Sequence, residues 1–418
     1  MKAIGLKRGY RTPFVKMGKE YARLNAVDLS VHLVNGILEK QLVPVEKIQH
    51  VIWGMVVPDP NIYSIGREVV LGSRLDSRVE AYSLSRACAT SLQAAANAVS
   101  FYQAFPEDPS VTLVGGVESF SAARPVLTDE AAAFFKLLSA KLPVGKKIAA
   151  FFKTPLTKFL PVPPSAKEYS TGLTMGEHCE LMVKEFKIAR ERQDQFALAS
   201  HQNAAAARAR IAPQLISIAG VTQDTLIRED TSLEALKGLT PAFDRSAAGT
   251  ITAGNSSPFT DGASALFCIS PALESKITPD AFLTDFEFVG VQPKDGLLMG
   301  PGKAMLRILQ RNRLRWDDLD YIEVHEAFAG QVLCNIEAVN DPAYRQEKYG
   351  TAYDAGRLEE SRLNPWGSSI AYGHPFGATG ARMLNQAIAF LQETKTKRAL
   401  LGICTAGALA GSALIERR

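Results

Sequence analysis

Cysteine is scarce in this chain: only five of its 418 residues are cysteines, and they stand at wide, irregular spacings. A disulfide framework or a zinc site needs paired or closely spaced cysteines, so neither is expected. Long apolar runs are missing, which indicates no membrane span, and the first residues lack the apolar stretch of a secretory signal. Neither sign of charge is in large excess: 47 basic and 43 acidic residues give +4, which indicates no nucleic-acid partner. We therefore expect a cytoplasmic protein with free thiols and no bound metal.

The length and the 46% hydrophobic content predict two or three domains around a large core. The chain also repeats itself. Residues 35–54 align without a gap on residues 306–325, so that Ile48 falls on Leu319 and Val51 on Ile322. Each copy is typical of an amphipathic helix, a short polar link with a carboxylate, and a strand.

A second pair of similar segments follows in the same order. Residues 91–102 match residues 380–391, and each segment leads through a polar loop into an apolar strand, 111–118 and 398–407. Alternating helices and buried strands favour α/β layers, and two matches in one order favour duplication over chance. Two similar halves around a pseudo-twofold axis would bring equivalent loops to one shared site.

The region between the halves, roughly residues 121–250, differs from both. Within residues 121–165 phenylalanines alternate with an excess of basic residues, and Pro143 and Gly145 divide the run into two pieces; a long helical pattern over 176–210 follows. Two interpretations stay open: a surface that meets a membrane, a partner subunit or a phosphate-bearing ligand, or a solvated flap whose phenylalanines pack on the body. The basic residues are Arg124, Lys136, Lys141, Lys146, Lys147, Lys153 and Lys158.

Cys88 stands in the segment SRACATSLQAAANAV, at the start of a run of small, helix-forming residues. We expect it in the first turn of a helix, with Thr90 or Ser91 as a cap. The free N–H groups and the dipole of a helix start stabilise a thiolate, so the position predicts a lowered pKa for Cys88. The alternative is that Cys88 is a small buried hydrophobic residue.

Three other loops rich in small residues carry reactive side chains. His374 lies in GHPFGATG, Cys404 in GICTAGALAG, and His325 in EVHEAFAG directly after a strand. The duplication places these loops at strand ends and helix starts, where α/β sheets bind ligands. Each residue alone could be structural, but the set favours one site. Two thiols and two imidazoles without close ligand spacing favour nucleophilic catalysis over metal binding, with loop N–H groups free to bind an oxyanion.

The sequence resembles the thiolase family over nearly its whole length. The motifs that carry the resemblance stand in thiolase order: RTPFVK, the Cys88 loop, MGEHCELM, TAGNSSPFTDGASA, HEAFA, GHPFGATGAR and CTAG. The resemblance implies an α/β fold of five layers, α-β-α-β-α, built from two duplicated halves with an inserted loop domain. The implied parts are an N-terminal half over 1–120 that 246–271 completes, the loop domain over 121–245, and a C-terminal half over 272–418.

The resemblance also implies roles for the four reactive residues. Cys88 would be the nucleophile that carries the acyl group, and His374 would activate it and help to hold the thioester oxygen in an oxyanion hole. Cys404 would be the acid and base for the acetyl group and for incoming CoA. His325, where many thiolases carry Asn, would form one oxyanion hole, and the backbone N–H groups of Cys88 and Ala406 the other.

Met175, Ser257 and Phe328 would contact CoA, which acts as co-substrate, so no permanently bound cofactor is implied. Ser257 has an alternative role, the stabilisation of its own turn. Outside the site, we expect His178 and His201 on helix surfaces and His32 and His50 at ordinary surface positions. Packing is the expected role of the remaining thiols, Cys179, Cys268 and Cys334.

HEAF and the basic insert are similar to one subgroup, the thiolase (beta) subunit of the fatty-acid oxidation trifunctional complex. That similarity implies cleavage of 3-ketoacyl-CoA by CoA, a homodimer, a hydratase/dehydrogenase (alpha) partner, and peripheral membrane contact through 131–163. A biosynthetic acetoacetyl-CoA thiolase is the alternative. A non-catalytic thiolase-like lipid-binding or scaffold protein is the third, which the four intact reactive residues disfavour.

Overall fold

The computed structural model describes residues 3–418. One large mixed sheet crosses the molecule in the order β4-β3-β5-β6-β1-β7-β10-β9-β8, and the short β2 pairs with β6. The strands are β1 (Ile4–Lys7), β2 (Val15–Lys16), β3 (Ile48–Gly54), β4 (Glu80–Leu84), β5 (Val111–Glu118), β6 (Thr260–Ile269), β7 (Ala281–Gly290), β8 (Tyr321–Val324), β9 (Arg398–Thr405) and β10 (Leu409–Glu416).

The helices flank this sheet on both faces or belong to the insert. The helices of the two halves are α1 (Ala26–Glu39), α2 (Ile65–Gly72), α3 (Thr90–Ala104), α9 (Gly300–Asn312), α10 (Ala329–Asn340), α11 (Pro342–Tyr344), α12 (Ser369–Tyr372) and α13 (Thr379–Thr394). Those of the insert are α4 (Asp129–Ser139), α5 (Val144–Lys153), α6 (Met175–Glu185), α7 (Arg190–Ile211) and α8 (Leu233–Lys237).

The predicted repeat is confirmed at the level of elements. The first aligned pair forms α1, a 3₁₀ turn at Val45–Lys47 and β3 in one half, and α9, a 3₁₀ turn at Trp316–Asp318 and β8 in the other. The second pair forms α3 followed by β5, and α13 followed by β9. In both halves the two strands pair in parallel, β3 with β5 and β8 with β9. The similar segments of sequence therefore form the same helix-and-strand units in both halves.

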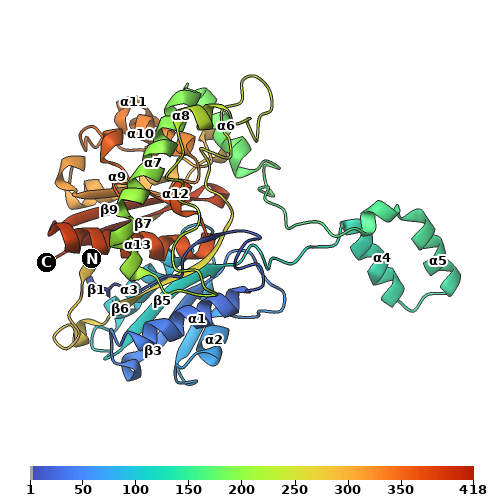
Figure 1. Ribbon diagram of the computed structural model, residues 1–418, viewed down its shortest axis with the longest axis horizontal. Helices are drawn as coiled ribbons and strands as arrows, with labels where there is room; N and C mark the ends of the chain where they lie inside the picture. The colour runs from blue at the N-terminus through green and yellow to red at the C-terminus, as the bar shows by residue number, and fades with distance from the viewer. Residues whose placement is uncertain (1–2) are drawn as a thin grey trace.

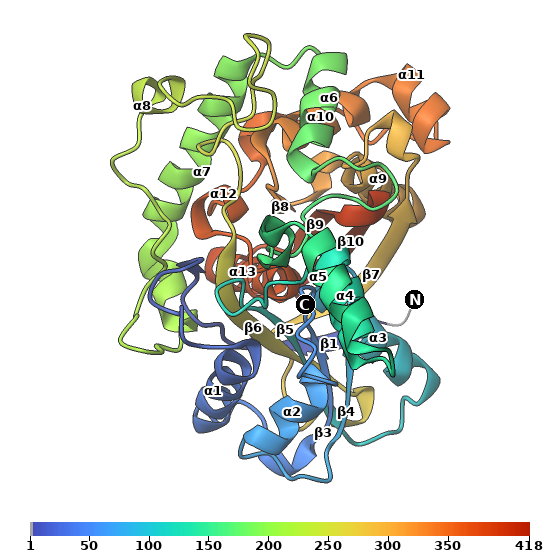
Figure 2. The ribbon, with the colours of Figure 1, turned by 90° about the vertical axis from the view of Figure 1, so that its right-hand side faces the viewer.

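The two halves meet through β1, which pairs antiparallel with β6 on one side and with β7 on the other. α3 and α13 pack together between the two parts of the sheet, where they share one buried core with residues of β3, β5, β7, β9 and β10. α1 and α2 cover the outer face of the first half, and α9 and α10 that of the second (Figures 1 and 2). The expected five-layered α/β fold is confirmed.

Small residues allow the two central helices to approach closely. A Cβ atom on Gly380 of α13 would lie 2.5 Å from the backbone nitrogen of Leu92 of α3, so only glycine fits there. Four of the nine buried residues of α3 are alanines, among them Ala94, Ala95 and Ala98. The alanine-rich run that follows Cys88 thus forms a thin layer between the two parts of the sheet, and its start is held deep inside the molecule.

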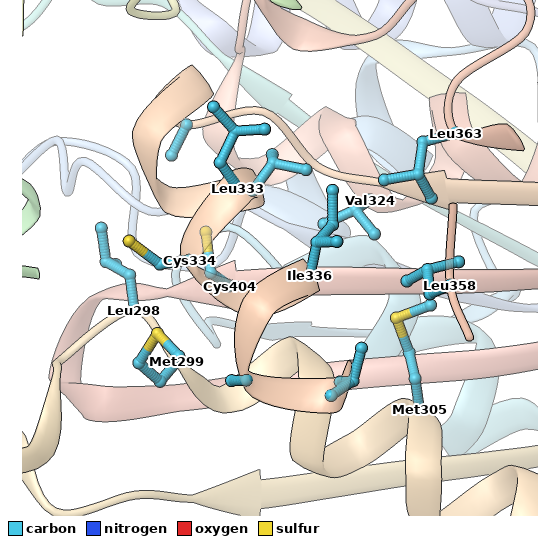
Figure 3. Packing of buried hydrophobic residues seen from close by; sticks show 14 of the residues in the cluster. Leu298, Met299, Met305, Val324, Leu333, Cys334, Ile336, Leu358, Leu363 and Cys404 are labelled. Carbon is cyan, nitrogen blue, oxygen red and sulfur yellow. The ribbon is translucent and has the colours of Figure 1, made fainter. Parts of the chain in front are cut away.

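The outer core of the second half lies between α9, α10 and the sheet. Figure 3 shows Leu333, Cys334 and Ile336 of α10 facing this core, with Cys404 on β9 beside them. Cys404 is only 1% exposed. Packing against α10 therefore fixes the strand that carries this thiol.

The insert contains a helical hairpin that stands away from the body of the molecule (Figure 1). α4, α5 and a 3₁₀ turn (Leu156–Phe159) form it, and Val126 and Val162 exchange two backbone hydrogen bonds at its base. The expected helix break is found between α4 and α5, where Pro143 is the N-cap residue of α5, whereas Gly145 lies inside the first turn of α5. Phe134, Phe151 and Phe159 pack on one another inside the hairpin.

The long helical pattern expected over 176–210 is divided into two helices in the structure. α6 ends at Glu185 and α7 begins at Arg190, and Lys187 between them has a φ of 53°. A lysine in the left-handed region ends a helix without any glycine or proline to signal it. Among residues 3–418, no helix combines the length and apolar character that crossing a bilayer requires.

Candidate active site

The four reactive residues predicted from the loops come from four separate elements. Cys88 precedes α3, His374 lies between α12 and α13, His325 follows β8 directly, and Cys404 lies in β9. Nε2 of His374 lies 3.1 Å from Sγ of Cys88, and the rings of His325 and His374 are 4.1 Å apart at their centroids. Cys404 is close enough to Cys88 for the Cys88 thiol to contribute to the raised pKa of Cys404.

Cys88 lies just outside its helix, not in the first turn. α3 begins at Thr90 with Ala89 as its N-cap residue, and no side chain caps it. Thr90 Oγ1 instead accepts a hydrogen bond from the backbone N–H of Arg86 and donates one to the carbonyl oxygen of Ala87, whose φ is 42°. This tight turn places the Cys88 thiol next to His374 at the N-terminal end of α3.

The predicted low pKa of Cys88 is wrong for the resting protein. Burial raises the pKa of the Cys88 thiol to about 12, although the N–H groups of Ala406 and of Cys88 itself act to lower it. Burial also raises the pKa of Cys404 well above its usual value, with the neighbouring Cys88 adding to the rise. Desolvation outweighs the helix start here, because the thiol lies between protein layers.

The two histidines are neutral for the same reason. Burial, with a smaller contribution from the Arg382 guanidinium, lowers the pKa of His374 to about 3. Burial, His374 and Arg382, in that order, hold the pKa of His325 well below its usual range. At neutral pH the site thus holds two thiols and two uncharged imidazoles.

His325 has one unused nitrogen. Its Nδ1 lies 2.7 Å from Oγ of Ser369, whereas its Nε2 is buried and has no hydrogen-bond partner among residues 3–418. One ring nitrogen of each histidine and Sγ of Cys88 lie within 4.8 Å of one another, a donor set that could also hold a metal ion. The expected lack of a metal therefore stays a prediction.

Sequence reasoning missed Glu118, at the end of β5. Its carboxylate accepts hydrogen bonds from the backbone N–H groups of Val56, Val57 and Gly377, and so ties the His374 loop to the first half. Burial raises the pKa of Glu118 to about 8. The only signal in the sequence is a carboxylate that closes an otherwise apolar strand.

A second missed group lies beneath His325. Glu323 of β8 and Arg382 of α13 form an ion pair in which neither side chain is more than 1% exposed. Arg382 also donates to Oγ of Ser369, at 3.0 Å, and Glu326 accepts from the backbone N–H of Ile370. Arg382 closes the GHPFGATGAR motif, but nothing in the sequence indicates its partner.

The three predicted CoA contacts gather around the HEAF loop. Ser257 donates to the carbonyl oxygen of Ala327 from both its backbone N–H and its hydroxyl, at 3.0 and 3.1 Å. Phe328 and the first turn of α6, next to Met175, both contact the ring of Phe243. The Ser257 hydroxyl is thus engaged within the protein, and its contact with CoA stays a prediction.

Two histidines expected on helix surfaces are buried instead. His178 is 5% exposed and its Nε2 lies 2.8 Å from Oγ1 of Thr171, while His201 is 4% exposed and accepts from the backbone N–H of Arg228. His32 is exposed as expected, and His50 is half-buried against Phe101. The remaining cysteines are buried free thiols, as predicted: Cys179, Cys268 and Cys334.

Comparison with known proteins identifies the family. Residues 6–272 match the thiolase N-terminal domain and residues 277–417 the thiolase C-terminal domain. A 3-ketoacyl-CoA thiolase of Citrobacter koseri is 36% identical over 99% of this chain and 96% of its own length, and one of Escherichia coli shows the same values.

Solved structures agree at the level of the whole fold. An acetyl-CoA acetyltransferase of Bacillus anthracis superposes with a TM-score of 0.83 at 25% identity, over 100% of this chain and 99% of that one. Human mitochondrial 3-ketoacyl-CoA thiolase in complex with CoA superposes with a TM-score of 0.83 at 26% identity, over 100% and 98%. On these matches, and with two halves that meet around a Cys-His pair, the chain belongs to the thiolase family.

Proposed function

We propose that this thiolase cleaves 3-ketoacyl-CoA with CoA, giving acetyl-CoA and an acyl-CoA two carbons shorter, as in fatty-acid β-oxidation. The contact of 3.1 Å between His374 Nε2 and Cys88 Sγ carries the proposal, because it pairs a nucleophile with a base inside a buried site. The curated relatives named as 3-ketoacyl-CoA thiolases support the same substrate class.

In the first half-reaction, the Cys88 thiol passes its proton to Nε2 of His374 and its sulfur attacks the 3-keto carbon. The backbone N–H groups of Cys88 and Ala406 stabilise the resulting oxyanion. The bond between the second and third carbons then breaks, and its electron pair moves to an enolate whose oxygen accepts from His325. The Cys404 thiol protonates the enolate carbon, which releases acetyl-CoA and leaves an acyl group on Cys88.

In the second half-reaction, the Cys404 thiolate takes the proton of an incoming CoA thiol. The CoA sulfur attacks the acyl-Cys88 thioester, the same pair of N–H groups holds the oxyanion, and the Cys88 sulfur leaves. It regains its proton from the His374 imidazolium. Each oxyanion donor of this kind typically contributes about 3 kcal/mol to lowering the barrier.

The neutral resting state suits this cycle. A Cys88 pKa of about 12 and a His374 pKa of about 3 keep the proton on sulfur until a substrate supplies the electrophile. The charge pair then forms only when donors are in place to stabilise it. Electrophiles that reach the site from solvent therefore meet the uncharged Cys88 thiol, which is less reactive than its thiolate.

A biosynthetic acetoacetyl-CoA thiolase is the second candidate, because the Bacillus anthracis acetyl-CoA acetyltransferase shares the whole fold. The deciding experiment is CoA-dependent thiolysis of 3-ketoacyl-CoA substrates of graded chain length. We expect turnover of medium or long chains, abolished in Cys88→Ala and kept in Cys268→Ala, whose thiol is buried in β6. Turnover of the four-carbon substrate alone would favour the second candidate, and turnover of none would refute both.

We propose a homodimer joined along β4. β4 is an edge strand whose residues Glu80, Tyr82 and Ser83 are exposed, and it leads directly into the Cys88 loop. An exposed edge strand in a sheet that is otherwise buried is a ready surface for pairing with a second copy. Such a dimer would stabilise the loop that carries the nucleophile.

We further propose that the hairpin over 131–163 meets a membrane surface or the hydratase/dehydrogenase partner. It exposes large apolar side chains, among them Phe152 at 81%, Leu156 at 72% and Val144 at 70%, beside its lysines. Basic and apolar side chains on one protruding element fit an anionic, partly apolar surface. The five free thiols fit a reducing compartment, which we propose is the cytoplasm.

A further inference from the structure

The two site histidines bind similar hydroxyl groups, but the hydroxyls differ in their other partners. Nδ1 of His325 lies 2.7 Å from Oγ of Ser369, and Nδ1 of His374 lies 2.6 Å from Oγ1 of Thr379. A neutral imidazole carries one N–H and one lone pair, and the bond at Nδ1 decides which of the two Nε2 presents. The remaining bonds of each hydroxyl therefore decide the chemistry at the other end of the ring.

The Thr379 hydroxyl directs its proton away from the His374 ring. Its hydroxyl donates to the carbonyl oxygen of Pro375 at 3.0 Å, and a carbonyl can only accept. Both contacts of this hydroxyl are hydrogen bonds at once only if Nδ1 of His374 is the donor to Oγ1. Nε2 of His374 then presents a lone pair to the Cys88 thiol.

Ser369 has the opposite arrangement. Arg382 donates to its Oγ at 3.0 Å, and a guanidinium can only donate. Ser369 is fully buried, and His325 offers the only acceptor within reach of its proton among residues 3–418. The hydroxyl therefore donates to Nδ1, so the His325 proton lies on Nε2, the nitrogen that has no partner.

The donor to Ser369 is itself held in place. Arg382 forms its buried ion pair with Glu323, which also accepts hydrogen bonds from the hydroxyls of Tyr321, at 2.6 Å, and Ser368, at 2.7 Å. A charge fixed by this many partners cannot turn away from Ser369 without leaving buried groups unpaired.

We propose that Thr379 and the Arg382–Ser369 pair are positioning residues that fix the two histidines as opposite tautomers, His374 as an acceptor and His325 as a donor. The proposal rests on the proposed function for its catalytic meaning: one ring takes the Cys88 proton while its neighbour donates to the enolate oxygen. Two histidines whose ring centroids are 4.1 Å apart thus perform opposite tasks, one accepting a proton and the other donating a hydrogen bond.

The test reads the tautomers directly. In protein labelled with ¹⁵N in its histidine rings, the signals of the two residues are assigned by their loss in His325→Asn and His374→Asn. We expect Nε2 of His325 and Nδ1 of His374 to be the protonated nitrogens. The same tautomer at both rings would overturn the proposal, whether or not the enzyme turns over.

Variants separate positioning from folding. Ser369→Ala should move the His325 signals toward the other tautomer and lower kcat about 10- to 100-fold with little change in KM, and Ser369→Thr, which keeps the hydroxyl, should restore both. The matched control is Ser412→Ala, a buried hydroxyl of β10 that donates to the carbonyl oxygen of Leu401 and contacts neither histidine nor Arg382; it should leave the ring signals in place. Unchanged His325 signals in folded Ser369→Ala would also overturn the proposal. Thiolysis that is absent while the tautomers are opposite would instead refute the proposed function.

Discussion

At the scale of single residues, the protonation of Cys88 can be measured by alkylation. With a pKa of about 12, the thiolate fraction is minute at neutral pH and rises tenfold per pH unit. We expect the rate of inactivation by iodoacetamide to climb about tenfold per unit from pH 7 to pH 10 without a plateau, measured as loss of thiolysis.

The control for alkylation is protein protected by saturating acyl-CoA, in which Cys88 is shielded or acylated and the rate should fall sharply. Because Cys179, Cys268, Cys334 and Cys404 are buried, they should contribute little to labelling, which mass spectrometry of the modified peptide can verify. A plateau at pH 7 would mean a resting thiolate and would restore the interpretation based on the helix start.

The residue scale also shows what sequence could and could not reveal. The presence of Cys88, His325, His374 and Cys404 in loops of small residues was enough to predict that they meet. Their ionisation was not predictable, because it depends on burial that neighbouring layers impose. Ser369 and Arg382 were not predictable either, since ordinary serines and arginines acquire their roles only from the partner across the fold.

At the scale of elements, one contact links the insert to the loop of the second thiol. The carboxylate of Glu168, between the hairpin and α6, accepts a hydrogen bond from the backbone N–H of Gly407 at 2.6 Å. Gly407 follows Ala406, whose N–H is proposed to bind the oxyanion, and it has a φ of 78°. The bond therefore helps to hold the orientation of the Ala406 peptide.

Replacing Glu168 by alanine should lower kcat about 3- to 10-fold, since one charge-assisted hydrogen bond that is partly exposed to water is lost. Glu168→Gln keeps an acceptor oxygen and should retain most of the activity. Steady-state thiolysis with both variants decides the matter. Equal activity of Glu168→Ala and the parent protein would show that the loop needs no support from the insert.

The lysines of the hairpin give a second prediction for an element. Lys146, Lys147 and Lys153 lie on α5, beside the exposed Ile148 and Phe152. Changing all three to glutamine should weaken binding to anionic liposomes at low salt by about 100-fold, because each basic residue near the surface contributes roughly 1 kcal/mol. Co-sedimentation with vesicles of anionic and neutral lipid measures the effect.

A matched control removes the same charge elsewhere. Lys276, Lys395 and Lys397 are exposed on the body, far from the hairpin in sequence, and their change to glutamine should leave liposome binding unaltered. Equal loss of binding in both triple variants would assign the effect to net charge and contradict a hairpin surface. Salt-insensitive binding would point to its apolar side chains.

Helices and strands were predictable from sequence where the spacing of apolar residues is regular. They were not predictable where tertiary contacts decide where an element ends or which side chains are buried. The helix and strand of each repeat were visible because apolar spacing alone specifies them, as in α1 followed by β3. The break between α6 and α7 was invisible, because Lys187 adopts a left-handed conformation that its sequence does not favour. The buried positions of His178 and His201 likewise follow from packing.

At the scale of the whole molecule, the candidate site lies within the two halves, and the hairpin stands away from them. The two halves share the α3–α13 core, and the site lies at the edge of that core, where Cys88 and His374 precede these two helices. The hairpin buries Phe134, at 8% exposed, within itself, and its two ends pair at Val126 and Val162. Its removal should therefore leave the body intact.

The final prediction replaces residues 127–161 by a two-residue Asn-Gly turn between Val126 and Val162, whose paired backbones already have the geometry of a hairpin. The midpoint of thermal unfolding should change by less than about 2 °C, because no core residue of either half is lost. Thiolysis of short 3-ketoacyl-CoA substrates should persist with kcat near that of the parent, whereas binding to anionic liposomes should disappear. A large fall in the unfolding midpoint would mean that the hairpin folds onto the body in solution, and liposome binding that persists would place the attachment surface on the two halves themselves.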